Sequence, residues 1–351
     1  MCPADFKSRM ETLHINTGNH SSSILLGESI ANLGKYLRTE RVIVITDTNV
    51  FRLYHHYMDR FPVVIIGTGE GNKSLGSIEM VLEKLLEFEA DRSTFIIGFG
   101  GGIVCDLAGF AASIYMRGLK FGFVSTTLLS QVDASVGGKN GINFKGFKNM
   151  IGVFRQPEFV LCDYSLLQSL EKKEFIAGFA EIIKAAAIRD EALFTFLTES
   201  SDKSLAQDPI TIHQIVNTAV KIKAAIVQND EREKGERRLL NFGHTFGHAI
   251  EKLTGMMHGE AVSLGMIMAA RLSVKLGVCS PDSASRLSDL LRQYGLPVNV
   301  PLKPADIFDA MRKDKKRENE IIHFVLLRKI GEAETRPIAI SELQSLIHDL
   351  C

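Results

Sequence analysis

The sequence has few cysteines, and none of them is spaced as a metal or redox motif. Five occur in 351 residues, at Cys2, Cys105, Cys162, Cys279 and Cys351. No CxxC pair is present, which argues against a zinc ribbon and against a thioredoxin-type site. Scattered cysteines in odd number do not form a disulfide framework, and this usage fits a reducing compartment. We therefore expect a cytoplasmic protein.

Long hydrophobic runs and an excess of charge of one sign are also missing. No window approaches the roughly 18 apolar residues of a membrane-spanning helix, and the polar N-terminus lacks the apolar core of a signal peptide. Lys plus Arg and Asp plus Glu both number 41. This balance argues against a general nucleic-acid binder. Hydrophobic residues at 45% and charged residues at 23% indicate a globular chain. We expect neither a nucleic-acid nor a membrane partner.

The first half alternates strand and helix signals. Apolar, β-branched runs predict strands at 41–46, 62–67, 94–98 and 121–124. Residues 77–88 carry apolar side chains at helical spacing, and a helical stretch is expected around 50–58. Strand–helix–strand order predicts right-handed crossovers and a parallel sheet. Ligands of such sheets bind outside the carboxyl ends of the strands.

The second half is mainly helical in pattern. Amphipathic stretches predict helices at 174–188, 210–228, 241–253 and 259–276. A hairpin is expected near the end, with a strand at 321–327 and a turn at Ile330 and Gly331. At roughly 150 residues per domain, the length suggests two domains. We place an α/β domain at 1–162 and a helical domain at 163–351.

A glycine-rich segment follows the third predicted strand. It runs from Gly98 to Gly102, and a helix is expected after it with Asp106 in the first turn. Glycines there let backbone N–H groups approach a phosphate at a helix N-terminus. The GxGxxG fingerprint is incomplete, because Ile103 stands at its last position. The segment is either a phosphate site or a tight strand-to-helix turn.

Histidines cluster in one region of the second half. His244 and His248 are spaced i, i+4, which places them on one helical face as in many metal-binding helices. Gly243 and Gly247 fall in the same predicted helix and indicate close approach of another backbone or of a ligand. His258 lies a few residues further on. Spacing leaves open whether His244 pairs with His248 or with His258, or whether no metal binds.

Charged residues also occur in unusual settings. Glu181 and Lys184 are spaced i, i+3 in an otherwise apolar helix, where charges need partners. They are either part of a site or a local ion pair. The stretch 126–139 follows a strand and ends in Lys139, and Lys148 comes soon after. Two lysines at the mouth of an α/β sheet suit an anionic ligand; the alternative is a solvated loop.

Taken together, these segments resemble the 3-dehydroquinate synthase family, within the wider group of sugar-phosphate cyclases. The matching stretches, in order, are GGGIVCDLAGF, YMRG, TTLLSQVDASVGGK, KNMIG, AEIIK, KAAIVQNDEREKGERRLLNFGHTFGHAIE and HGEAV. The resemblance covers most of the chain with its spacings kept. It implies an N-terminal NAD-binding α/β domain with a parallel sheet and a mainly α-helical C-terminal metal-binding domain.

The resemblance also implies a reaction. The family is a phosphate-eliminating lyase that converts 3-deoxy-D-arabino-heptulosonate 7-phosphate to 3-dehydroquinate in the shikimate pathway of aromatic amino acid biosynthesis. NAD is regenerated in each turnover, and a divalent metal is needed, usually Zn²⁺ with Co²⁺ as the alternative. The alternatives are a cyclase making 2-deoxy-scyllo-inosose or 2-epi-5-epi-valiolone, a metal-dependent polyol dehydrogenase, and a catalytically silent metabolite sensor. A homodimer is expected.

Site residues are carried over position by position. The metal ligands implied are Glu181, His244 and His258, which leaves His248 a catalytic or substrate-contacting role. The NAD contacts implied are Asp47, Asn49, Glu70, Lys73, Gly101, Gly102, Asp106, Thr126, Thr127, Leu129, Lys139, Lys148 and Ser169. The catalytic and substrate-binding residues implied are Asp133, Lys139, Lys148, Asn149, Lys184, Lys223, Arg237, Asn241, His248 and Lys316, with Arg117 reaching in from a neighbouring subunit. Lys315 rivals Lys316 as the phosphate ligand.

The chain departs from the family pattern at a few positions. Asn140 stands where a threonine is usual, Glu171 replaces a common proline, and Ala185 follows Lys184 where larger residues are frequent. None of these changes removes a matched metal ligand or lysine.

Overall fold

The computed structural model describes residues 10–18, 20–300, 302–312, 320–348 and 350. Contacts divide the chain into two compact units, one of Met1–Glu171 with Ile212–Gln228 and one of Lys172–Thr211 with Asn229–Cys351. The expected division at 162/163 falls before the break at 171/172, and it places all of helix α7 (Pro209–Asn229) in the second domain. The middle of α7 belongs with the first unit, because its side chains bond to residues of that unit.

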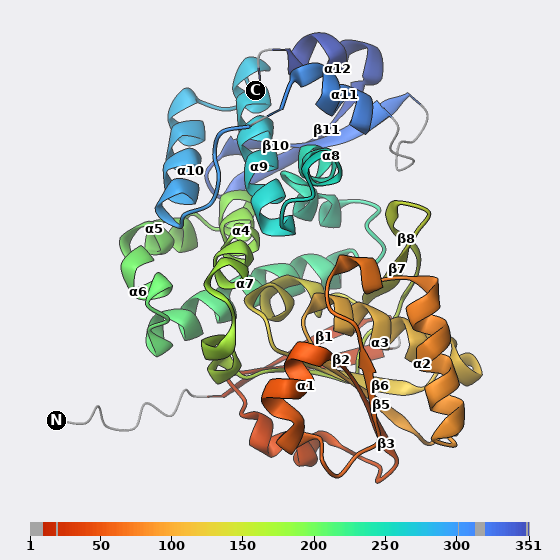
Figure 1. Ribbon diagram of the computed structural model, residues 1–351. Coiled ribbons are helices and arrows are strands. Elements are labelled where there is room, and N and C mark those ends of the chain that lie inside the picture. Colours follow the sequence, from red (N-terminus) through yellow and green to blue (C-terminus); the bar gives the residue numbers. More distant parts are fainter. Residues whose placement is uncertain (1–9, 19, 301, 313–319, 349, 351) are drawn as a thin grey trace, which may run out of the picture. The chain divides into compact units, whose positions relative to one another are not determined.

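The first unit is built on a seven-stranded sheet of order β1-β2-β9-β6-β5-β3-β4 (Figure 1). Its strands are β1 (Glu11–Thr17), β2 (His20–Leu26), β3 (Val42–Asp47), β4 (Val63–Ile66), β5 (Phe95–Gly100), β6 (Lys120–Ser125) and β9 (Phe159–Cys162). β1 pairs antiparallel with β2, and all other neighbours are parallel. The four strands predicted from the sequence are β3 to β6, so the parallel α/β sheet is confirmed.

Both faces of this sheet are covered, which explains why its strands are continuously apolar. Val42 and Val44 of β3 lie in a core with Leu33 from the 3₁₀ helix Ile30–Tyr36. Ile43 and Ile45 alternate to the opposite face and are equally buried. The helices that connect the strands are α1 (Thr48–Tyr54), α2 (Leu75–Glu87) and α3 (Gly102–Ile114).

Several elements of the first unit have no counterpart in the sequence prediction. They are β1, β2, β9, the hairpin of β7 (Lys139–Phe144) and β8 (Phe147–Phe154), and a π-helix at Ser130–Ala134. Serine-rich β2 and the lysine- and asparagine-rich hairpin have the composition of loops. β2 pairs with its neighbour β1 and with the remote β9, and β7 pairs with β8. The π-helix is a rare element that often marks a functional site.

The second unit is mainly helical. Its helices are α4 (Lys172–Arg189), α5 (Glu191–Glu199), α6 (Ser201–Leu205), α8 (His244–Thr254), α9 (His258–Lys275), α10 (Pro281–Gln293), α11 (Pro304–Arg312) and α12 (Ile340–Ile347). The hairpin of β10 (Ile321–Lys329) and β11 (Glu332–Ala339) confirms the predicted C-terminal turn. Among the described helices, none combines the length and apolarity needed to span a membrane.

The prediction of one helix over 241–253 is wrong at its start. Residues Glu236–Asn241 form a 3₁₀ helix, and α8 begins only at His244. Gly243 between them is left-handed, with φ of 78°, a conformation that ends one helix before the next begins. Gly243 therefore separates two helices and is not an interior helix residue.

Candidate functional site

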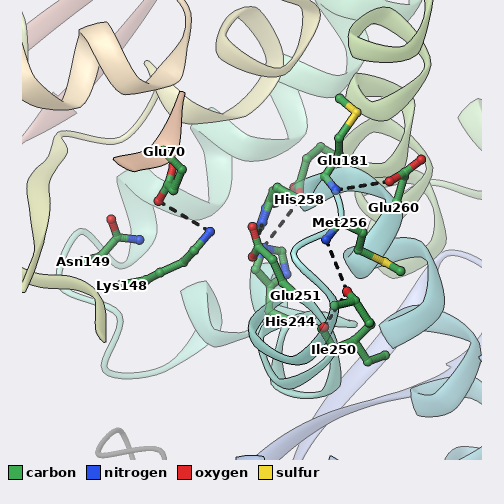
Figure 2. Close-up of polar contacts among 12 residues, drawn as sticks. Glu70, Lys148, Asn149, Glu181, His244, Ile250, Glu251, Met256, His258 and Glu260 are labelled. Atoms are coloured by element: carbon green, nitrogen blue, oxygen red, sulfur yellow. Dashed lines mark hydrogen bonds and ion pairs between the residues drawn. The ribbon is translucent and has the colours of Figure 1, made fainter. Parts of the chain in front are cut away.

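Glu181, His244 and His258 bring one ligand atom each to a common point in the second unit (Figure 2). Glu181 Oε1 lies 3.5 Å from His244 Nε2 and 3.6 Å from His258 Nε2. Ligand atoms around a tetrahedral Zn²⁺, with bonds of about 2.0–2.2 Å, are separated by roughly 3.3–3.6 Å. Glu181 Oε1 is fully buried and makes no hydrogen bond among the described residues. These three residues therefore fit a divalent cation.

Neighbouring groups orient each ligand of this cluster. Lys184 forms an ion pair with the other carboxylate oxygen of Glu181, and both side chains are buried, with 2% and 3% of the residue exposed. Glu251 Oε2 lies 3.4 Å from His258 Nδ1, and the Phe242 carbonyl lies 3.3 Å from His244 Nδ1. A partner at Nδ1 directs Nε2 toward a metal, the usual arrangement around histidine ligands. No role was expected for Glu251 from the sequence, although it lies seven residues after His244 and therefore on the same helical face as His244 and His248.

The charges around the cluster favour a bound cation. Burial raises the pKa of the Glu181 carboxyl, but Lys184 and His258 lower it to about 2. Burial lowers the pKa of His258, but the Glu181 and Glu251 carboxylates raise it to about 9. The carboxylates thus hold a positive charge at the His258 ring when no metal is bound. A divalent cation would take the place of that proton.

Glycines bring the helices that carry these ligands close together. A Cβ at Gly259 of α9 would lie 2.1 Å from the Ala177 carbonyl oxygen of α4. A Cβ at Gly265 of α9 would lie 1.9 Å from the Gly243 carbonyl oxygen, and one at Gly247 would lie 3.0 Å from the Ala261 carbonyl oxygen. Side chains at these positions would hold the backbones apart. The glycines flanking the histidines therefore serve close approach of another backbone.

His248 lies beside the cluster and is not part of it. Its ring centroid is 5.4 Å from that of His244, the same distance as between His244 and His258, and 6.2 Å from that of His258. The ligand atoms that converge, however, come from Glu181, His244 and His258. Of the two pairings left open by spacing, the structure brings His244 together with His258. Arg237 is buried and donates to the Glu231 carbonyl, while Asn241 donates to Glu233 in the same unit.

In the first unit, the glycine segment forms the turn from β5 into α3. Gly98 and Gly100 lie within β5, and Gly101 is the N-cap of α3. Because Gly101 has no side chain, it leaves the first N–H groups of α3 to other acceptors. A Cβ there would approach Thr127 Cγ2 to 3.0 Å. Asp106 lies beyond the first turn, not within it as expected, because α3 begins at Gly102.

A buried ion pair lies at this carboxyl edge of the sheet. Lys73 Nζ bonds to Asp106 Oδ2 and lies 2.6 Å from Asn149 Oδ1. Burial raises the pKa of Asp106, and Lys73 opposes that rise. Lys148 Nζ lies 3.5 Å from Glu70 Oε1 (Figure 2). Residues that the resemblance assigned to NAD and to substrate thus form one network here.

Asn143 organises this network, and sequence reasoning missed it. Its Nδ2 donates to Glu70 Oε1 at 2.8 Å, and its Oδ1 accepts from the Asn149 N–H at 2.9 Å. Its own N–H donates to the Lys73 carbonyl at 2.9 Å. Asn149 is held with φ of 52°, an uncommon conformation for a non-glycine residue. Only the hairpin pairing brings these residues together, so the sequence alone carried no clear signal for Asn143.

The remaining residues assigned to NAD lie at or near strand ends. Asp47 caps α1 by accepting from the Asn49 and Val50 N–H groups at 2.9 Å. The N–H of Thr126 donates to the Gly100 carbonyl. Thr127 and Leu129 immediately precede the π-helix, and the Ser130 hydroxyl bonds to Thr127. Ser169 lies 2.5 Å from the Tyr54 hydroxyl.

Asp133 and Lys223 also meet within the first unit. Lys223 Nζ lies 2.5 Å from Asp133 Oδ1 and 2.6 Å from the Asp133 carbonyl oxygen. Asp133 comes from the π-helix and Lys223 from α7, so a sequence separation of 90 residues is closed by one ion pair. The structure therefore brings together two residues that the resemblance placed at the substrate.

Three further expectations concern Lys139, Arg117 and the lysines 315 and 316. Lys139 is the exposed first residue of β7. Arg117 is exposed in a turn where Met116, Arg117 and Gly118 all have positive φ, at 47°, 70° and 124°. Lys315 and Lys316 lie outside the described residues, so the phosphate ligand stays a prediction.

The substitution at Asn140 has a clear structural role. Its Nδ2 donates to the Gly138 and Arg155 carbonyls at 3.0 and 2.9 Å, and its side chain packs where a Cβ at Gly109 would be. Asn140 therefore anchors the start of the hairpin against α3. Nothing in the structure explains Glu171 or Ala185 beyond their places at the start and inside of α4.

Comparison with known proteins supplies the family. Residues 63–177 match the family described as 3-dehydroquinate synthase N-terminal, and residues 178–317 match 3-dehydroquinate synthase C-terminal. The 3-dehydroquinate synthase of Desulforamulus reducens is 41% identical over 343 residues, covering 93% of this chain and 96% of the relative.

Two solved structures have the same fold over almost the whole chain. A 2-deoxy-scyllo-inosose synthase complexed with carbaglucose-6-phosphate, NAD⁺ and Co²⁺ gives a TM-score of 0.85 at 25% identity, covering 97% of this chain and 100% of that one. A 2-epi-5-epi-valiolone synthase from Streptomyces hygroscopicus, with NAD⁺ and Zn²⁺ bound, gives 0.86 at 26% identity, covering 96% and 98%. With both halves matched in order and the relative covered almost end to end, this chain belongs to the 3-dehydroquinate synthase family.

Proposed function

We propose that the chain is a 3-dehydroquinate synthase, a lyase that converts 3-deoxy-D-arabino-heptulosonate 7-phosphate to 3-dehydroquinate and phosphate. The observation that carries this is the 41% identity to a synthase of that name over 93% of the chain. The cluster of Glu181, His244 and His258, with its orienting partners, supports a metal-dependent member of the family.

The metal is proposed to be Zn²⁺, with Co²⁺ as the alternative, held by Glu181, His244 and His258. Once bound, it supplies a Lewis acid that polarises a substrate hydroxyl. Lys184 fixes one oxygen of Glu181 and leaves the other for the ion. Three protein ligands leave a coordination position open for substrate oxygen. His248, beside the cluster, is placed to hold or move a proton on the substrate.

NAD is proposed to bind at the carboxyl edge of the sheet in the first unit. Bound there, NAD would supply reversible hydride transfer within one turnover. The backbone at Gly101 and Gly102 binds the pyrophosphate at the start of α3. The other proposed contacts are Asp47, Asn49, Glu70, Lys73, Asp106, Thr126, Thr127, Leu129, Lys139, Lys148 and Ser169.

The substrate carries a carboxylate and a phosphate and therefore needs cationic partners. We assign this role to Lys139, Lys148, Lys184, Lys223 and Arg237, and to Lys316. Asp133, Asn149, Asn241 and His248 complete the proposed set. Asp133 pairs with Lys223 and so fixes where this cation points, and Asn149 accepts from Lys73, one of the residues proposed for NAD.

We further propose a cytoplasmic homodimer that acts in aromatic amino acid biosynthesis. In this dimer Arg117 serves the neighbouring subunit. Two exposed apolar side chains, Ile114 and Met116, flank the same turn, and such side chains are common where a partner packs.

The second candidate is another sugar-phosphate cyclase, because the solved relatives have that activity. Their identity to this chain is 25% and 26%, against 41% for the synthase of Desulforamulus reducens. The difference favours the dehydroquinate reaction.

One assay separates these candidates. Purified protein is incubated with the heptulosonate phosphate, NAD and a divalent metal, and phosphate, dehydroquinate and NADH are followed together. We expect phosphate and dehydroquinate in equal amounts without net NADH. Consumption of glucose 6-phosphate or a heptose 7-phosphate, with the heptulosonate untouched, would contradict the proposal. Net NADH accumulation would indicate a dehydrogenase.

A further inference from the structure

A cavity lies in the first unit at the amino-terminal edge of the sheet, away from the proposed NAD site. Its volume is about 620 Å³, within the range of about 300–1,000 Å³ common for small-molecule sites. It is lined by the first residues of β5, β6 and β9, by Lys35 and Tyr36 at the end of the first 3₁₀ helix, and by Arg38 and Thr39 just after it. The glycine turn lies at the opposite end of β5. No residue that lines this cavity is assigned above to NAD, metal or substrate.

One wall of the cavity is aromatic and held in place. Phe95 and Phe159 stack with centroids 5.8 Å apart and ring planes within 7°, and Tyr36 lies 5.8 Å from Phe159. The Tyr36 hydroxyl donates to Glu28, and burial together with this carboxylate raises the pKa of Tyr36 to about 12. Phe95 and Phe159 are almost fully buried, with 5% and 3% of the residue exposed. These contacts fix the rings, so a ligand meets an apolar wall that does not need to reorder.

The rim of the cavity is cationic. Lys35, Arg38, Arg92 and Lys120 line it, and the single acidic lining residue is Glu158. Lys120 lies 3.6 Å from Glu158. In the part of the chain that the structure describes, the other three cations have no carboxylate within ion-pair distance. Lys120 thus faces Glu158. Burial raises the pKa of Glu28, but its hydrogen bonds and the charge of Lys35 lower it. Arg38 and Arg92 are therefore the cations best placed for an anion, because arginine pairs especially well with carboxylate, sulfonate or phosphate oxygens.

We propose that this cavity binds a small anion that carries a planar ring, with the ring against Tyr36, Phe95 and Phe159 and the anionic group at Arg38 and Arg92. The site is independent of the NAD edge, because the two lie at opposite ends of the same strands. It adds a second small-molecule site to the enzyme and does not depend on the proposed activity.

The test uses the full chain and the fluorescent aromatic sulfonate anilinonaphthalene sulfonate. We expect saturable binding that benzoate displaces, that NAD leaves unchanged and that inorganic phosphate displaces poorly. The double substitution Arg38→Glu with Arg92→Glu should weaken binding at least about tenfold, because it removes the charge-assisted contacts and adds repulsion. The matched control is Lys84→Glu with Arg312→Glu, two exposed cations outside the cavity, which should keep wild-type affinity.

A second variant distinguishes binding inside the cavity from a long-range effect of the altered charges on ligand affinity. Thr39→Trp fills the cavity while leaving its charges in place, and it should also weaken binding. Equal affinity in wild type and in both cavity variants would overturn the proposal, as would displacement by NAD. Displacement by phosphate as readily as by benzoate would overturn the requirement for a planar ring.

Discussion

At the residue scale, one carboxylate of the second unit pairs with a lysine through one oxygen and faces two histidines through the other. Glu181 gives one oxygen to Lys184 and directs the other to two imidazoles. An isolated buried carboxylate would be costly, and the lysine offsets that cost without occupying the metal-facing oxygen. The sequence suggested both a site and a local ion pair as alternatives. The structure shows the ion pair with Lys184, and it brings the other oxygen of Glu181 to His244 and His258, where a cation fits.

The ligand assignment predicts different outcomes for two neighbouring histidines. His258→Ala should abolish stoichiometric metal binding, because it removes one of three protein ligands. His248→Ala should retain the metal and lose turnover. Metal content measured by atomic emission after gel filtration, alongside circular dichroism to verify folding, tests both. Retention of a full metal equivalent by His258→Ala would exclude the assignment.

The family resemblance assigned no role to Glu251, but its carboxylate lies 3.4 Å from His258 Nδ1. Glu251→Gln keeps the shape and removes the charge that orients this ring. We expect the metal dissociation constant to rise about 10- to 100-fold, as is typical for such outer partners. Competition with a chromogenic chelator measures it. Glu260→Gln, at the start of α9 and not bonded to a ligand histidine, is the matched control; equal affinity in both variants would contradict a role for Glu251.

At the scale of elements, the sequence predicted the strands and helices whose burial requires a recognisable pattern of apolar residues. Continuous apolar runs gave β3 to β6, and helical spacing gave α4, α7 and α9. The prediction failed for β1, β2, β7 and β8, whose polar sequences acquire strand structure from pairing across the sheet or hairpin. It also failed for β9, which is apolar and buried, because a run of this length cannot be distinguished from a buried helical segment by periodicity. The start of α8 was missed because the left-handed Gly243 depends on packing against α9, which the local sequence does not reveal.

The close packing of α8 on α9 predicts a strong effect of one methyl group. Gly265→Ala should lower the free energy of unfolding by about 2–3 kcal/mol, because the added Cβ overlaps the Gly243 carbonyl and forces the helices apart. Urea unfolding followed by circular dichroism measures it. Gly76→Ala in α2, where the nearest atom is 3.9 Å away, is the control. We expect the control to be neutral or stabilised by up to about 1 kcal/mol; an equal change in stability in both variants would show that the close approach to Gly243 does not set the cost.

At the scale of the whole molecule, zero net charge conceals an uneven distribution. The cations proposed for the substrate are lysines and arginines that the sequence scatters from 117 to 316. Carboxylates hold two of the described cations in place: Asp133 pairs with Lys223, and Glu181 pairs with Lys184. Neutrality of the chain is therefore compatible with an anionic substrate.

The proposed dimer predicts that two inactive variants restore each other. If Arg117 serves the neighbouring subunit, a mixed dimer of Arg117→Ala and Lys139→Ala contains one site with Lys139 from its own chain and an intact Arg117 from its partner. Equal mixing gives half mixed dimers, so refolding the variants together should recover about a quarter of wild-type activity. Each variant refolded alone is the control. If Arg117 acted within its own subunit, every site in the mixture would lack one of the two residues, and activity would stay at the level of the separate variants.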